Sequence, residues 1–297
     1  MKIIQELARE RWALGFIHGG MDAVMRGISQ EKRLEVDWVK MPKDRWYADP
    51  FLLDVTETEI LLLVEDYAYD AGKGVISLLH IDRESMEITS RKVLLEKNTH
   101  LSFPAILRRN GHMYVYPESA QSGKLDMYEY HQNVESLTFY KTICDDIVWD
   151  SWITEFFGKP LLFTTAKNNY QLDIYCWDTK IKRYVPCMQI PSEKPNSRLG
   201  GAIFEYEQEY YYPAQDCSRN YGSAIDIKRI NYSEGKFELS VIKHLTLSHP
   251  NYQLGMHTLN EYKGVVVIDV HGFRYGWFGA IIAKIAKCKK KFLRRIV

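Results

Sequence analysis

The sequence predicts an all-β protein that forms a five-bladed β-propeller. A unit of an apolar strand, a turn and a second strand ending on a polar residue occurs five times. One position at the entry of each unit recurs at intervals of 54, 47, 51 and 56 residues, a spacing that suits one blade per unit. Several units also carry turn residues between their two strands. We call these five entry positions the anchor positions: Asp49, Phe103, Asp150, Gly201 and His257.

The five units differ in how clearly their turns can be recognised. In chain order the units cover residues 48–66, 102–119, 150–166, 200–216 and 255–272. Asn110-Gly111 is a strong two-residue hairpin signal, since both residues tolerate a positive φ. Gly158-Lys159 and Lys263-Gly264 are weaker signals of the same kind.

Further strands are expected between the units. The candidates are residues 74–82, 125–131, 171–178 and 225–232. Two inner and two outer strands would give each unit a four-stranded blade, and five blades closed around an axis leave only short sheet edges. An irregular β-sandwich is the alternative fold, but the regular spacing of the units favours the propeller.

Only the two ends of the chain have helical patterns. Residues 3–14 could form a short lead-in helix. In 278–296, apolar residues recur at steps of three and four, and basic residues occupy the other face. We therefore divide the chain into a propeller, residues 1–274, and a basic amphipathic helix, residues 275–297. Seven basic residues within 284–295 predict that this helix docks on an anionic membrane surface or an acidic partner.

Composition excludes several classes of function. The formal net charge is +1, which argues against nucleic-acid binding because that needs a basic face. The five cysteines have neither a disulfide framework nor metal-ligand spacing, and no nucleotide-binding or hydrolase motif occurs. We therefore expect no metal and no cofactor. No stretch reaches 18 apolar residues, so the expected location is the cytoplasm, at most peripheral at the inner face of the membrane.

The anchor positions are the main candidates for a functional site. Equivalent positions of propeller blades meet at one mouth of the central channel, so Asp49, Asp150 and His257 are expected to lie together. Glu65, Glu118 and Asp216 close second strands and are expected to lie either further out or toward the same mouth. Carboxylates accept hydrogen bonds from sugar hydroxyls, and aromatic residues such as Trp46 stack on sugar faces. Glycosidic bond chemistry uses one protonated and one ionised carboxyl group.

Each candidate also has a structural alternative. Asp49 could cap a blade before Pro50, Glu118 could form an inter-blade salt bridge, and Asp150 could serve in structural hydrogen bonds. His257 could be a satisfied core histidine. Arg198 could bind a sugar hydroxyl, carboxylate or phosphate, or form a blade-to-blade ion pair with an Asp or Glu. His100 is a further residue that could reach the mouth.

These motifs resemble the N-terminal propeller domain of the plant glucosamine inositolphosphorylceramide transferases and its bacterial relatives. The resemblance runs from about Trp12 to Gly272. It rests on seven segments: 46–51, Glu65 with 73–76, 100–104, 113–114 with 117–119, Arg198 with 200–201, 215–217 and 221–222. In the plant proteins a separate glycosyltransferase domain follows the propeller, so the transferase activity is not carried over.

The propeller is also similar to the five-bladed fold of furanosidase-type glycoside hydrolases. That similarity implies a first-blade Asp as general base, a third-blade Asp that tunes it and a fourth-blade Glu as acid. Asp49 and Asp150 match the first two roles by blade. The fourth blade opens with Arg198 and has no Glu there, so Glu118 is the candidate acid.

Two functions follow, and the first is slightly favoured. The chain could be a carbohydrate-active enzyme, hydrolase-like or glycosyl-transferring, that uses Asp49, Glu118 and Asp150 on a surface polysaccharide or glycolipid. It could instead be a non-catalytic glycan-binding or assembly propeller of the same biosynthetic pathways. In either case the expected substrate-binding residues are Trp46, Glu65, His100, Arg198, Asp216 and His257.

Overall fold

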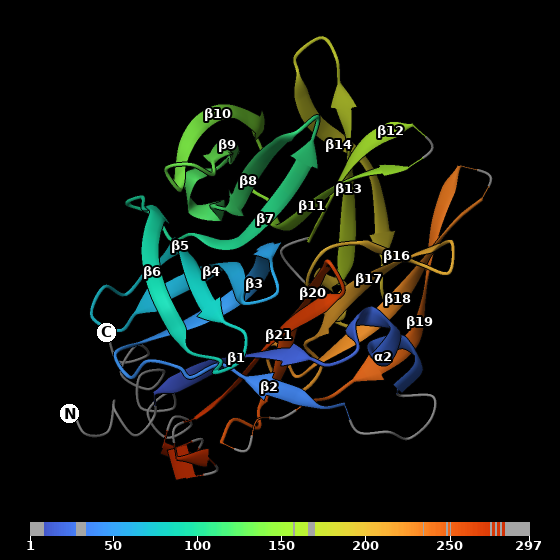
Figure 1. Cartoon of the computed structure of the whole chain (residues 1–297). Coiled ribbons are helices and arrows are strands. Elements are labelled where there is room, and N and C mark those ends of the chain that lie inside the picture. The colour runs from blue at the N-terminus through green and yellow to red at the C-terminus, as the bar shows by residue number, and fades with distance from the viewer. Residues whose placement is uncertain are drawn as a thin grey trace, which may run out of the picture.

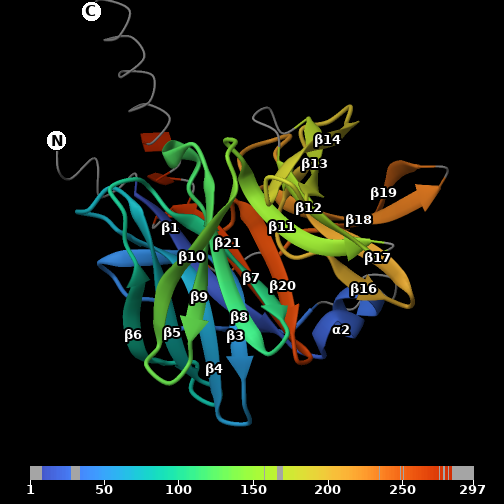
Figure 2. The same cartoon turned by 90° about the horizontal axis from the view of Figure 1, so that it is seen from above.

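The computed structural model confirms the five-bladed propeller. It describes residues 9–27, 34–156, 158–165, 170–233, 235–247, 249, 251–273, 275, 276, 278, 279, 281 and 282. Five antiparallel sheets follow one another around a ring in chain order (Figure 1). A view turned by 90° shows the sheets from above (Figure 2).

The strands of each blade are ordered from the centre outwards, and the outer strands expected from the sequence are present. Blade 1 contains β3 (Arg45–Val55), β4 (Glu59–Ala68), β5 (Gly74–Asp82) and β6 (Ile88–Leu95). Blade 2 contains β7 (Ser102–Arg109), β8 (His112–Glu118), β9 (Leu125–His131) and β10 (Ser136–Cys144), with a 3-10 turn, η2 (Ala120–Ser122). Blade 3 contains β11 (Trp149–Phe156), β12 (Lys159–Thr165), β13 (Gln171–Asp178) and β14 (Arg183–Pro191).

The last two blades depart from this simple order. Blade 4 contains β15 (Arg198–Leu199), β16 (Phe204–Tyr206), β17 (Glu209–Asp216), β18 (Ala224–Ser233) and β19 (Lys236–Leu245). Its innermost strand is split, because β15 and β16 both pair with β17. Blade 5 contains β20 (Gly255–Tyr262), β21 (Val265–Phe273), β1 (Glu10–Ile17) and β2 (Val36–Trp38). The helix α2 (Gly20–Gly27) connects β1 to β2.

Blade 5 closes the ring with strands from both ends of the described chain. β1 pairs with β21 over eight residues, from Glu10 opposite Phe273 to Ile17 opposite Val266. The helix predicted for 3–14 is therefore wrong from Glu10 onwards, and residues 1–8 lie outside the described residues. β1 is buried over seven of its eight residues. Pairing with β2 and β21 satisfies its backbone and buries both faces, which outweighs a weak local helix preference.

The anchor positions are sites of backbone irregularity. Asp49, Phe103 and Asp150 have positive φ values of 49°, 44° and 39°. The register of the inner strand shifts at each of these three positions and again at His257. Such bulges re-aim side chains and are common beside functional sites. In blade 4 the equivalent Gly201 has φ 149°, and a Cβ there would lie 2.1 Å from the Leu259 carbonyl oxygen, so only glycine fits.

Aromatic packing begins directly beside the anchor positions. Phe51 lies two residues after Asp49, and its ring packs against Phe103 with centroids 4.9 Å apart. It also stacks on Trp152, two residues after Asp150, at 6.1 Å. Burying a side chain such as Phe51 stabilises a fold by about 1.5–3 kcal/mol. These contacts join blades 1, 2 and 3 at the centre of the ring.

Two cysteines differ from the expectation drawn from the sequence. Cys176 on β13 and Cys187 on β14 form a disulfide, with Cα atoms 5.7 Å apart. The expectation that the cysteines hold no disulfide is therefore wrong for this pair. The physical reason is the outer hairpin of blade 3, which brings neighbouring strands together over a separation of 11 residues. Cys144 and Cys217 are free among the described residues.

The C-terminal helix stays a prediction. Most of the expected helix falls on residues 283–297, which lie outside the described residues. In the described part, α2 is the one α-helix with defined bounds. None of the described helices is long and apolar enough to cross a membrane.

Candidate functional site

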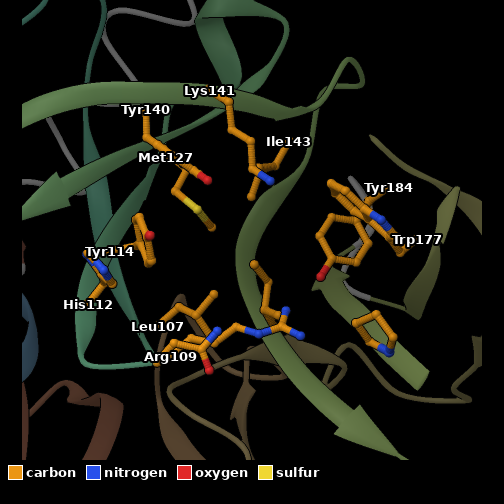
Figure 3. Close-up of a pocket in the computed structure, with 13 residues that line it drawn as sticks. Leu107, Arg109, His112, Tyr114, Met127, Tyr140, Lys141, Ile143, Trp177 and Tyr184 are labelled. Carbon is orange, nitrogen blue, oxygen red and sulfur yellow. The ribbon is translucent and has the colours of Figure 1, made fainter. Parts of the chain in front are cut away.

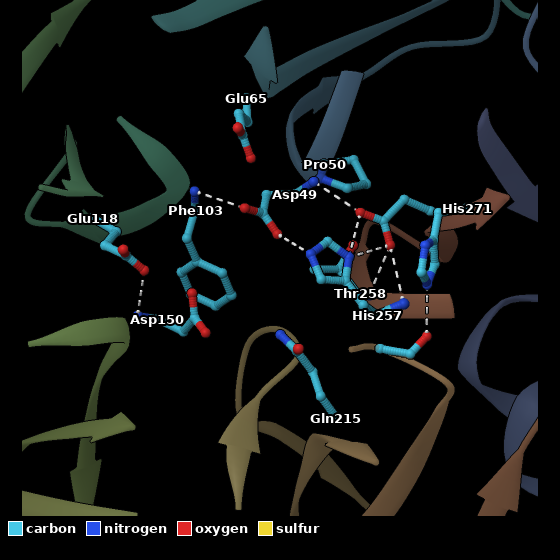
Figure 4. Close-up of polar contacts among 12 residues, drawn as sticks. Asp49, Pro50, Glu65, Phe103, Glu118, Asp150, Gln215, His257, Thr258 and His271 are labelled. Atoms are coloured by element: carbon cyan, nitrogen blue, oxygen red, sulfur yellow. Dashed lines mark hydrogen bonds and ion pairs between the residues drawn. The ribbon is translucent and has the colours of Figure 1, made fainter. Parts of the chain in front are cut away.

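One mouth of the ring gathers most of the predicted residues. It lies where the inner strands carry their bulges, and Figure 4 shows Asp49, Glu118, Asp150 and His257 around it. We call the following set the acidic mouth: Asp49, Glu65, Glu118, Asp150, Arg198, His257 and Asp269. They come from β3, β4, β8, β11, β15, β20 and β21, so every blade contributes at least one side chain.

Asp49, His257 and Asp269 form a buried chain, in which His257 makes an ion pair with Asp49 and a hydrogen bond with Asp269. His257 Nε2 lies 3.3 Å from Asp49 Oδ1, and His257 Nδ1 lies 2.8 Å from Asp269. Asp269 also accepts hydrogen bonds from the backbone N–H groups of Asp49, at 2.9 Å, and Thr258, at 2.8 Å. Burial alone would lower the pKa of His257, but Asp269 and Asp49 raise it above its usual value. The two acids therefore favour the protonated form of the imidazole between them.

Asp49 is held near its titration point at neutral pH. Burial raises its pKa to about 7, together with the negative charges of Asp150 and Asp269, although His257 opposes the shift. Its Oδ2 accepts a hydrogen bond from the backbone N–H of Phe103 at 3.1 Å. A carboxyl group with this pKa can exchange a proton under physiological conditions.

Glu118, Asp150 and Arg198 form a second cluster across the mouth. Glu118 Oε2 accepts a hydrogen bond from the backbone N–H of Asp150 at 3.1 Å. The Nε atom of Arg198 forms an ion pair with Asp150, and its Nη2 atom lies 3.9 Å from Glu118 Oε2. Burial and the Asp150 charge raise the pKa of Glu118 well above its usual value. The protein environment therefore favours the protonated form of Glu118 more than water does.

Glu65 and His100 form a third pair at the edge of the mouth. His100 Nε2 lies 3.2 Å from Glu65 Oε1. His100 Nδ1 accepts from the backbone N–H of Gly74 at 2.9 Å, so the Nε2 atom of a neutral ring carries the proton that faces Glu65. Burial lowers the pKa of His100, and burial with Asp49 and Glu118 raises that of Glu65 well above its usual value.

Aromatic rings flank the acids. Trp46 stacks on Tyr67 with centroids 4.6 Å apart, and Trp12 lies 5.8 Å from Trp46 and 4.4 Å from His257. Tyr221 is 44% exposed, and its ring lies 5.3 Å from His257 and 5.2 Å from Arg198 Cζ. It therefore connects the two clusters at the surface of the mouth, where a ligand could reach it.

Comparisons with known proteins agree with this architecture. A family model described as "Glucosamine inositolphosphorylceramide transferase 1, N-terminal" matches residues 38–262. The chain belongs to this family. The glucosamine inositolphosphorylceramide transferase 1 of Arabidopsis thaliana is 30% identical over 193 residues, which cover 62% of this chain and 25% of the plant protein. The protein of that name from Oryza sativa subsp. japonica is 24% identical over 245 residues, 74% of this chain and 33% of the rice protein. The chain thus spans a quarter to a third of these relatives.

Solved structures of low sequence identity share the fold of this transferase-family domain. An exo-β-1,3-galactanase from Clostridium thermocellum has a TM-score of 0.52 at 11% identity, covering 73% of this chain and 52% of that protein. The RS223 β-xylosidase has a TM-score of 0.51 at 12% identity, covering 71% of this chain and 80% of that protein. At these identities the likeness shows the propeller fold alone.

Asp216 lies apart from the other predicted residues of this family domain. It ends β17 and lines a separate cavity of about 750 Å³ with Asp226, Lys228 and His244. Its Oδ1 accepts a hydrogen bond from the backbone N–H of Ser218 at 2.9 Å. The structure therefore brings together eight of the nine predicted residues or places them beside the mouth: Asp49, Glu118, Asp150, Trp46, Glu65, His100, Arg198 and His257.

Asp269 and Trp12 were not predicted from the sequence. Asp269 lies in the middle of β21, opposite Thr258, and interrupts the apolar run Val265–Val270. That interruption was the available signal. No signal in the sequence pointed to Trp12, because this residue reaches the mouth only through the pairing of β1 with β21.

The acids also connect neighbouring blades, as the structural alternatives proposed. Asp269 of blade 5 binds the Asp49 N–H of blade 1, and Asp49 binds the Phe103 N–H of blade 2. Glu118 of blade 2 binds the Asp150 N–H of blade 3. A hydrogen bond to a charged group contributes about 1.5–3 kcal/mol. The same side chains therefore support the ring and face the mouth.

Asp49, His257 and Asp269 could also hold a metal ion. One ligand atom from each lies within 4.8 Å of the others. Metal binding requires a neutral imidazole, whereas these carboxylates favour the protonated form of His257. A cation would thus have to displace the proton, and the expectation of a metal-free site stays a prediction.

Proposed function

We propose that the acidic mouth binds the amino-sugar headgroup of a glycolipid or surface polysaccharide. The observation that carries this proposal is a surplus of carboxyl groups among the described residues of the mouth: Asp49, Glu65, Glu118, Asp150 and Asp269. Arg198 and His257 compensate only part of this charge if the acids ionise. A ligand that brings its own positive charge is the natural complement of such a site.

The pKa shifts support a cationic ligand. Burial and neighbouring carboxylates raise the pKa values of Asp49, Glu65 and Glu118. An ammonium group would favour the ionised forms and so remove part of the cost of gathering acids. Trp46 and Tyr221 offer flat faces for the sugar ring. The names of the curated relatives include glucosamine and inositolphosphorylceramide, which supports an amino sugar linked to a glycolipid.

We assign a binding role first because of Arg198. In the related hydrolase fold the fourth blade is expected to supply the acid, but here it supplies Arg198, which pairs with Asp150 and approaches Glu118. Arg198 therefore engages Asp150 and Glu118 in contacts within the protein. The domain would then present a glycolipid headgroup to a transferase, or assist its assembly.

A catalytic role is the second candidate, and one observation favours it. Asp49 has a pKa of about 7, and the pKa of Glu118 lies well above its usual value. Two carboxyl groups in different protonation states are what glycosidic bond chemistry requires. In that case Asp49 would act as base, Glu118 as acid and Asp150 as the group that orients them.

Calorimetric titration with glucosamine, N-acetylglucosamine and glucose tests the binding proposal. Glucosamine should bind at least tenfold more tightly than its acetylated form, which lacks the charge. Glu65→Gln should weaken glucosamine binding by about tenfold, whereas Glu57→Gln, an exposed acid in the β3–β4 turn, should leave it unchanged. Equal affinity for the three sugars would refute the proposal.

Turnover of aryl-glycosides of the same sugars tests the second candidate. Activity that Glu118→Gln abolishes, while glucosamine still binds, would establish the catalytic role. Binding without turnover in the wild-type protein would leave the binding role as the function of the mouth.

A further inference from the structure

A second pocket lies at the opposite end of the blades from the acidic mouth. It is a cavity of about 450 Å³ between blades 2 and 3, a size typical of small-molecule sites. β7 begins with Ser102 beside the mouth and ends with Arg109 at this cavity, and eight strand residues span about 23 Å. The two sites are therefore separate. We call this cavity the basic aromatic pocket (Figure 3).

Two pairs of aromatic rings face each other across the pocket. Tyr114 and Tyr140 of blade 2 lie with centroids 4.9 Å apart. Trp177 and Tyr184 of blade 3 form a T-shaped pair at 5.0 Å. All four side chains line the cavity, and Figure 3 shows the two pairs on opposite sides. Flat apolar faces on two walls suit a ring-shaped ligand such as a hexose.

Arg109 and Lys141 add positive charge to this pocket. Lys141 Nζ lies 4.7 Å from the centroid of Trp177 and 5.2 Å from that of Tyr140. Neither cation forms an ion pair with an acid among the described residues. The nearby acids are engaged elsewhere, since Glu129 binds His112 at 2.7 Å and Asp145 binds Arg183 at 3.2 Å.

A bulge in β10 places these groups together. The register shifts between Phe139 and Lys141, so the strand has an extra residue at Tyr140. Successive residues of a regular strand point to opposite faces, but here both Tyr140 and Lys141 line the cavity. Burial lowers the pKa of Lys141, as do the charges of Arg183, Arg109 and Lys182. An anionic ligand would relieve this repulsion.

We propose that the basic aromatic pocket binds an anionic sugar, a hexose that carries a phosphate or a carboxylate group. The sugar ring lies between the tyrosine pair and the tryptophan pair, and the anion binds Arg109 and Lys141. This proposal does not depend on the function of the acidic mouth, because the two sites have opposite charge and lie at opposite ends of the blades. The domain would thereby hold a cationic sugar at one end and an acidic sugar at the other.

Calorimetric titration of the full chain tests this site with four probes: glucose 1-phosphate, glucuronate, glucose and inorganic phosphate. The two anionic sugars should bind more tightly than glucose, which lacks the charge, and than phosphate, which lacks the ring. Lys141→Gln and Arg109→Gln should each weaken their binding by roughly tenfold. Lys236→Gln, the same substitution at an exposed position of blade 4, should change nothing.

Three outcomes would overturn the proposal. The first is no binding of either anionic sugar at millimolar concentration. The second is equal affinity for inorganic phosphate and glucose 1-phosphate, which would exclude recognition of the sugar. The third is unchanged affinity in both pocket variants. Glucosamine binding by Lys141→Gln, measured in parallel, separates failure of this site from failure of the acidic mouth.

Discussion

His257 Nε2 and Asp49 Oδ1 lie 3.3 Å apart although 208 residues separate them in the chain. The contact joins the last blade to the first. On its other side His257 is bound by Asp269, which also holds the backbone of Asp49. The side chain that is most poised to exchange a proton is therefore fixed by the blade that closes the ring.

The pKa of Asp49 predicts a pH-dependent stability. Its folded pKa of about 7 lies above the value of about 3.9 expected in the unfolded chain. The folded state therefore binds more protons between these values, and the contribution of Asp49 to the free energy of unfolding falls as pH rises from about 4 to about 7. Urea unfolding of the wild type and Asp49→Asn at pH 5 and pH 8 checks this. Asp49→Asn should lose less stability over the interval, and identical losses in both proteins would contradict the assignment.

Arg198→Gln should destabilise the propeller by about 3–5 kcal/mol, because it leaves two buried carboxyl groups without their cation. Arg198→Lys should recover part of this loss, since it restores the charge but not the planar fork. Urea unfolding at pH 7 measures both. The exposed ion pair of Arg229 with Glu209 provides the control, and Arg229→Gln should cost less than about 1 kcal/mol. Similar losses in the free energy of unfolding for Arg198→Gln and Arg229→Gln would show that Arg198 does not compensate the two buried acids.

The Cys176–Cys187 pair predicts a redox-dependent stability. Cys187→Ser should lower the free energy of unfolding by about 2–3 kcal/mol under oxidising conditions and have little effect in excess dithiothreitol. Cys217→Ser is the matched control: it keeps the Cys176–Cys187 pair, so it should lose as much stability in dithiothreitol as the wild type does. Thiol titration of the unfolded protein adds a direct count. Five reactive thiols in freshly isolated protein would show a reduced pair, in keeping with the cytoplasmic location expected from the sequence.

The basic segment 284–295 predicts binding to anionic membranes. Each basic residue near an anionic leaflet contributes about 1 kcal/mol, and salt screens the effect. The full chain should co-sediment with anionic liposomes but not with neutral ones, and a chain truncated after Gly272 should not co-sediment with either. If both chains behave alike and without salt dependence, the segment is no membrane anchor.

Much of the fold could be predicted because the blade is a repeated unit. Five anchor positions were found from spacing, and the structure places a bulge or a glycine-dependent turn at each of them. Equivalent positions meet at one mouth, so Asp49, Asp150 and His257 could be grouped from their places in the repeat. Each blade needs the same irregular backbone at its anchor position. The residues that allow it therefore recur five times, and the repeat can be recognised in a single sequence.

The predictions that were wrong concern residues whose structure depends on contacts outside the repeated unit. The segment from Glu10 looks helical alone, but it becomes a strand because β21 offers an unpaired edge. Asp216 ends its strand as Glu118 does, yet the neighbouring loop binds its carboxylate and it lines another cavity. The pairing of Cys176 with Cys187 depends on the register of β13 and β14, which the sequence does not encode locally.

The pairing of β1 with β21 also sets the order of events during biosynthesis. β1 is made before the other strands of the ring, and its partner β21 ends at Phe273. At about 5–20 residues per second, the nascent β1 must wait on the order of 10–50 s for that partner. Trp12 lies on β1, so its ring centroid comes within 4.4 Å of that of His257 only when β1 and β21 pair. A nascent chain that has not yet made β21 therefore lacks one wall of the acidic mouth, and the sugar binding that we propose there requires both strands.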